Sequence, residues 1–100
     1  MPTEPELAAL WAVQTQTPFP AACAGRTVAG VKLMRLDAAA AELVGRAVRA
    51  GTPPGAEERV RLEECARAIE AVLPALDGEG RAYFERLGRL VAGVLGGLPT

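Results

Sequence analysis

The stretch AEERVRLEECARAIEAVLPAL, residues 56–76, decides the fold of this chain. Its apolar residues recur at spacings of three and four, and at 100° per residue they fall within an arc of roughly 120°. This stripe consists of Leu62, Cys65, Ala66, Ile69, Val72, Leu73 and Leu76. The pattern predicts an amphipathic helix over 56–76, which ends near Leu73 because Pro74 removes a backbone donor inside the last turn.

The same periodicity predicts three more helices, over 4–15, 38–50 and 79–95. Asp37 is the predicted N-cap of the second of these, because its carboxylate accepts the free amides of the first turn. Gly51 is the predicted C-terminal stop of the same helix. Four amphipathic helices joined by short Pro/Gly turns predict an all-α, four-helix bundle-like fold, with a single helical domain over 1–100.

The segment 17–36 has no clear periodicity and is predicted to be irregular or to hold a short helix or strand. Pro18 and Pro20 exclude a regular helix, and Phe19 between them is expected to pin the connector. A strand needs a partner, and no second β-like segment appears elsewhere in the sequence, so a strand within 27–36 would require pairing with another copy. We therefore favour a short helix or an extended loop.

The composition excludes several classes of protein. With 100 residues, 50% hydrophobic and 23% charged, the chain matches one folded domain, not a disordered segment. A net charge of −1 gives no general attraction to nucleic acid or an anionic membrane. The sequence contains no histidine, the commonest general base and metal ligand. We therefore expect a non-enzymatic protein without catalytic residues, bound metal or cofactor.

The sequence also bears on the compartment. Its acidic N-terminus lacks the cationic and apolar regions of a secretory signal. The longest apolar run, 90–98, has nine residues, whereas a membrane-spanning helix needs roughly 20. Two cysteines are too few for a disulfide scaffold. These features predict a cytoplasmic protein with reduced thiols and no membrane span. Arginine outnumbers lysine ten to one, which indicates a GC-rich bacterial genome.

The two thiols have different expected surroundings. Cys65 lies on the apolar stripe of its helix, where a thiol is most simply a small buried hydrophobe with a raised pKa. Cys23 lies in the connector rich in proline and alanine, so we expect it to be the more accessible of the two. A catalytic cysteine needs a base, and none of the histidine-paired kinds is available. Cys23 is therefore a candidate reactive thiol, and not a catalytic one.

Charge is unevenly spread, because residues 26–50 include five basic and two acidic residues. Arg35, Arg46 and Arg49 are candidate interaction residues, for phosphates or for an acidic protein, if they share one helix face. The turn after residue 51 does not match a helix-turn-helix, and the following helix is acidic, which disfavours nucleic acid. Val60 lies off the apolar stripe of its helix and is a candidate contact in a homodimer.

The leading hypothesis is a small helical protein that acts through protein–protein contacts. Such a protein is an adaptor, a regulator, an antitoxin-like or immunity-like partner, or a self-assembling subunit. Its partner is another protein or a second copy, with no membrane involved. Two alternatives stay open: a nucleic-acid-binding regulator that uses Arg35, Arg46 and Arg49, and a thiol-dependent redox sensor at Cys23.

Overall fold

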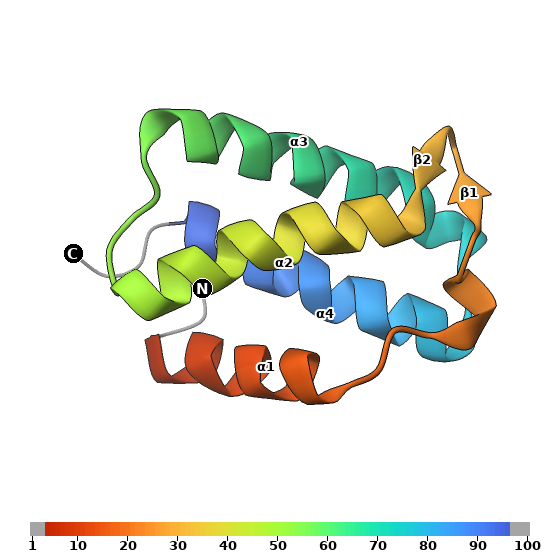
Figure 1. Ribbon diagram of the computed structural model, residues 1–100, viewed down its shortest axis with the longest axis horizontal. Coiled ribbons are helices and arrows are strands. Elements are labelled where there is room, and N and C mark those ends of the chain that lie inside the picture. Colours follow the sequence, from red (N-terminus) through yellow and green to blue (C-terminus); the bar gives the residue numbers. More distant parts are fainter. Residues whose placement is uncertain (1–3, 97–100) are drawn as a thin grey trace.

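The computed structural model describes residues 4–96 and confirms an all-α bundle (Figure 1). The predicted single domain over 1–100 extends beyond this range at both ends. The helices are α1 (Glu4–Gln16), α2 (Leu33–Ala50), α3 (Ala56–Val72) and α4 (Gly78–Leu95). The first and last helices match their predicted bounds to within one residue.

α4 is the helix on which the others pack, because it contacts α1, α2 and α3. Its buried side chains are Tyr83, Phe84, Leu87, Leu90, Val91 and Val94. Burial of each large apolar side chain of this kind stabilises the fold by about 1.5–3 kcal/mol. Gly88 allows α3 to approach closely, since a Cβ at this position would lie 3.2 Å from Ile69 Cγ2.

α2 begins at Leu33, five residues before the predicted start, so the assignment of Asp37 as an N-cap is wrong. The reason is burial: Leu33 and Leu36 are 0% and 6% exposed and extend the apolar stripe towards the N-terminus. Burying two leucines is worth more than an N-cap bond of about 1 kcal/mol. The predicted stop is confirmed, because Gly51 adopts left-handed backbone with φ +66° and its N–H donates to the carbonyl of Ala47.

α3 ends as Pro74 predicts. The α-helix stops at Val72, and a 3₁₀ turn, η2 (Leu73–Ala75), replaces the remaining residues of the predicted 56–76 helix. Leu76 follows the turn in extended backbone and is buried at 4% exposure. The chain therefore closes the core at this end before α4 begins.

The connector forms a β-hairpin at one end of the bundle, beside the start of α2 (Figure 1). After a 3₁₀ turn, η1 (Ala21–Cys23), the strands β1 (Thr27–Val28) and β2 (Val31–Lys32) pair antiparallel with each other. The expectation that a strand here would require another copy is therefore wrong. The strands are only two residues long, so their pattern was too short to read in the sequence.

Phe19 pins the connector to α4, as predicted. Its ring lies edge-on to Tyr83 and Phe84, with centroid distances of 5.6 and 6.2 Å. Edge-to-face aromatic pairs add about 0.5–1.5 kcal/mol beyond the area that they bury. These contacts fix the path of the chain from α1 to the hairpin.

The hairpin turn carries backbone strain that a substitution can relieve. Ala29 and Gly30 both have positive φ, at 52° and 76°, as a two-residue type I′ turn requires. Left-handed backbone costs an alanine about 1 kcal/mol, whereas asparagine tolerates it. We therefore predict that Ala29→Asn raises the free energy of unfolding by about 0.5–1 kcal/mol, as measured by chemical denaturation.

Ala24→Asn is the matched control, because Ala24 is exposed and has an ordinary φ of −63°. It is expected to leave the free energy of unfolding unchanged. Equal effects of the two substitutions, or a loss of stability in Ala29→Asn, would contradict the strained turn.

Candidate functional site

A groove of about 450 Å³ runs between α2 and α3, starting at the hairpin. We name it the α2–α3 groove. Its apolar lining consists of Val31, Leu36, Ala39, Leu43, Cys65 and Ala68. Its charged lining consists of Lys32, Arg35, Arg61 and Glu64. The groove therefore combines an apolar floor with more cations than carboxylates.

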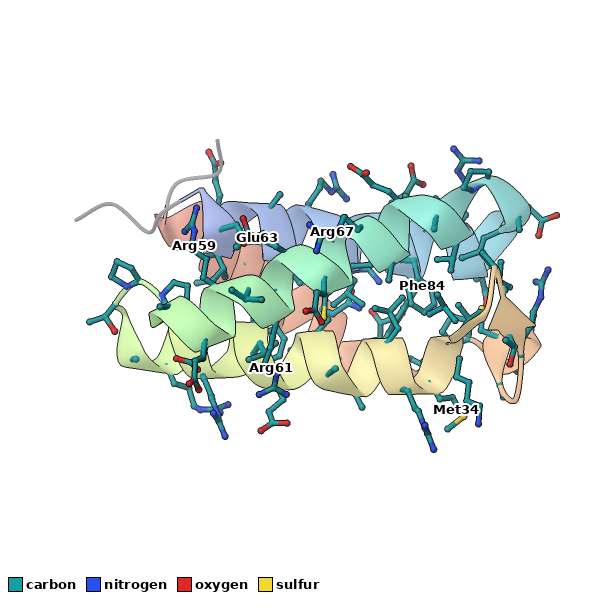
Figure 2. The ribbon with its side chains drawn as sticks, turned by 90° about the horizontal axis from the view of Figure 1, so that it is seen from above. Met34, Arg59, Arg61, Glu63, Arg67 and Phe84 are labelled. Carbon is teal, nitrogen blue, oxygen red and sulfur yellow. The ribbon has the colours of Figure 1, made fainter. Side chains whose placement is uncertain are left out.

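The cations of the groove are available to a ligand. Within residues 4–96, none of the three ion pairs involves Lys32, Arg35 or Arg61. Figure 2 shows Arg61 on the side of α3 that faces α2, whereas Arg59 and Arg67 lie on the opposite side of the helix. Arg61 was not predicted from the sequence, although its spacing of four residues from Cys65 places the two side chains on one helix face.

Cys65 forms part of the groove wall and is 8% exposed. Burial raises the pKa of its thiol, the nearby Arg61 guanidinium opposes this rise and Glu64 adds to it. The prediction of a buried thiol with a raised pKa is confirmed. A protonated thiol acts as an apolar wall of the groove and not as a nucleophile.

Cys23 is buried at 1% exposure, so the expectation of an accessible thiol is wrong. It lies in η1 against the first turn of α4, where a Cβ on Gly80 would lie 2.9 Å from Cys23 Sγ. Local sequence could not show this contact, because 57 residues separate the two positions in the chain. Both cysteines are free thiols. The buried position removes the accessibility that a redox sensor at Cys23 requires.

The contact between Cys23 and Gly80 can be tested by a double-mutant cycle. Gly80→Ala alone is expected to lower the free energy of unfolding by about 1 kcal/mol or more, because the new methyl group overlaps the sulfur. In a Cys23→Ala background the same change should be neutral or stabilising, since alanine favours a helix over glycine by about 1 kcal/mol. An identical effect in both backgrounds, measured by chemical denaturation, would show that the two side chains do not touch.

The three predicted arginines of α2 have different surroundings. Arg35 lines the α2–α3 groove. Arg46 forms exposed ion pairs with Glu42 at 3.0 Å and with Glu58 at 3.7 Å, so two carboxylates lie beside its charge. Arg49 lies fourteen residues after Arg35, which is about 21 Å along the helix. The structure therefore does not gather the three into one cationic cluster.

The fourth candidate interaction residue, Val60, is on an exposed part of α3. Its side chain is 53% exposed, and it does not line the groove. Single exposed valines are common on monomers. This position therefore carries no argument for or against a homodimer.

A partly buried polar cluster connects three helices and was not predicted from the sequence. Tyr83 donates its hydroxyl hydrogen to Asp37 Oδ1 at 2.8 Å, which joins α4 to α2. Arg86 Nε donates to Gln14 Oε1 at 2.7 Å, which joins α4 to α1. Burial raises the pKa of Asp37, although the hydrogen bond from Tyr83 acts in the opposite direction. Burial and the neighbouring Asp37 both raise the pKa of Tyr83.

The raised pKa of Asp37 predicts a pH-dependent stability. A carboxyl whose pKa is higher in the folded state than its ordinary value of 3.8 stabilises the fold most when protonated, and this contribution is lost as pH rises through the folded-state pKa. Asp37→Asn keeps an oxygen acceptor for Tyr83 without a charge. Relative to the unsubstituted protein, this variant should therefore gain stability between about pH 3 and about pH 7.

The measurement is urea denaturation of both proteins across that pH range. The difference in free energy of unfolding should move in favour of Asp37→Asn as pH increases. A difference that stays constant, or that moves in favour of the unsubstituted protein, would contradict a raised pKa at Asp37.

Two further properties concern the described part of the chain. Within residues 4–96, no three cysteine, aspartate or glutamate side chains form a group that could hold a metal ion. None of the helices in this range has the length and apolar character needed to cross a membrane.

Comparisons with protein-family models, with curated proteins and with solved structures found no match to this chain.

Proposed function

We propose that this chain is a non-enzymatic protein-interaction module, which binds an acidic segment of a partner protein in the α2–α3 groove. The observation that carries the proposal is the lining of this groove, where an apolar floor lies beside Lys32, Arg35 and Arg61. The single carboxylate of the lining, Glu64, leaves an excess of positive charge in a chain whose net charge is −1.

The chemistry of the groove defines the partner segment. Apolar side chains of the partner would cover Leu36, Ala39 and Ala68, and its carboxylates would pair with the cations. Charge complementarity of this kind raises the association rate and disfavours basic segments. The floor extends along α2 from Leu36 to Leu43, which is about 10 Å. This length suits about two turns of a partner helix.

The proposal keeps the leading sequence hypothesis and narrows it. Such a groove would serve an adaptor, a regulator, or an antitoxin-like or immunity-like protein. The cytoplasmic location, the bacterial origin and the homodimer stay predictions. For nucleic acid, Arg46 lies beside two carboxylates that would repel phosphates, and Arg35 and Arg49 are about 21 Å apart on α2. That arrangement favours a protein ligand over phosphates along a duplex.

A photo-crosslinking experiment tests the proposal. A photoreactive residue replaces Ala68 in the groove, and the full chain is irradiated in a lysate of its source, before and after nuclease treatment. We predict a crosslink to a protein segment that combines carboxylates with apolar residues. Arg61→Glu should reduce the crosslink yield about tenfold, because it reverses a charge that faces the segment.

Arg67→Glu is the matched control, since it makes the same charge change on the opposite side of α3 (Figure 2). It should leave the yield unchanged. The proposal fails if the two variants behave alike, if the crosslinked segment is basic, or if nuclease removes the signal. A crosslink only to a second copy of this chain would replace it with the self-assembling interpretation.

A further inference from the structure

A second hollow, of about 330 Å³, adjoins the α2–α3 groove at the hairpin. We name it the hairpin hollow. It is lined by Gly25, Arg26, Thr27, Lys32, Met34 and Arg35. Lys32 and Arg35 line both the groove and the hollow, so the two cavities lie next to each other.

Three cations from three parts of the fold line the hollow. Arg26 precedes β1, Lys32 ends β2, and Arg35 lies in the first turn of α2. None of them is in an ion pair within residues 4–96, and no carboxylate lines the hollow. Like charges placed together repel one another, which favours occupation by an anion.

The hairpin fixes the backbone positions from which these side chains extend. The hairpin register pairs Thr27 with Lys32, and the N–H of Leu33 donates to the carbonyl of Arg26 at 3.1 Å. Arg26 also donates through Nη2 to the carbonyl of Ala75 in η2, at 3.3 Å. The hollow is therefore attached to both α2 and the end of α3.

We infer that the hairpin hollow binds a phosphate group carried by the partner segment that occupies the groove, an inference that rests on the proposed function. A carboxylate would neutralise one of the three cations. A phosphoryl group on a side chain carries a charge of about −1.5 to −2 and has three acceptor oxygens, which matches two guanidinium groups and an ammonium. The hydroxyl of Thr27 supplies one more donor beside them.

The exposed side chain of Met34 supports a ligand-binding site at this end of the bundle. Its side chain is 56% exposed at the edge of the hollow and points outward from α2 (Figure 2). A flexible thioether packs against apolar groups of many shapes. The hollow therefore offers an apolar contact for the residues that flank the phosphorylated one.

Nuclear magnetic resonance of the full chain tests the inference. The probes are N-acetyl phosphoserine methylamide, the corresponding glutamate derivative and inorganic phosphate, each titrated at constant ionic strength. We expect saturable shifts of the amides in 25–35, with phosphoserine binding about tenfold more tightly than glutamate. Phosphoserine should also bind more tightly than inorganic phosphate, because Met34 contacts the serine derivative.

The variants separate the hollow from the groove. Arg26 and Lys32 line the hollow, so Arg26→Gln and Lys32→Gln should each weaken phosphoserine binding about tenfold. Arg61 lines the groove alone, so Arg61→Gln should have no effect on it. Arg59→Gln, on the far side of α3, is the surface control.

Two results would overturn the inference. One is a set of shifts that do not saturate or that chloride reproduces. The other is equal weakening by Arg26→Gln and Arg59→Gln. If phosphoserine fails to bind while crosslinking still depends on Arg61, this inference fails and the proposed function stands. If inorganic phosphate binds as tightly as phosphoserine, the ligand is a free phosphate compound, and the assignment to a partner segment is wrong.

Discussion

The burial of α4 is the constraint on which the rest of the structure depends. Phe84, Leu87 and Leu90 are fully buried, and α1, α2 and α3 all pack on this one helix. α2 and α3 also contact each other, and the edge of the core between them, with Leu36, Leu43 and Cys65, forms the floor of the groove. Gly88 allows α3 to pack closely on α4. This packing defines the position of α3, which forms one wall of the groove. The candidate binding surface is thus a consequence of how the core is filled.

The partly buried polar cluster makes this arrangement specific. Apolar contacts have little directional preference, and an alanine-rich core with few aromatic residues tolerates sliding of one helix on another. The hydrogen bond from Tyr83 to Asp37 defines the position of α2 on α4, and the bond from Arg86 to Gln14 does the same for α1. A shift of either helix would break its hydrogen bond to α4, which is costly for groups that are partly buried. The groove therefore keeps one shape, which a binding site needs in order to discriminate among partners.

Where the sequence predicted the structure, the signal was local and periodic. The stripe from Leu62 to Val72 defined α3, and Pro74 defined its end, because side-chain spacing and a missing donor act within one or two turns. Asp37 was misplaced because an N-cap rule uses only neighbouring residues, whereas its partner Tyr83 lies 46 residues away. The burial of Cys23 against Gly80 and the self-paired hairpin depend in the same way on contacts that no single segment contains.

The residues of the candidate site also differ in whether a local signal in the sequence could identify them. Arg35 was predicted from local charge, whereas Lys32 and Arg61 could be assigned to the site only once the structure placed α2 and α3 side by side.

Amide hydrogen exchange of the full chain, free and bound to its crosslinked partner, tests most directly the central claim that a partner segment binds in the α2–α3 groove. Slower exchange in the bound state confined to residues 25–43 and 61–68 is the predicted result, since these segments line the groove and the adjoining hairpin hollow. Protection centred on α1, or on the outer surface of α4, would contradict the account.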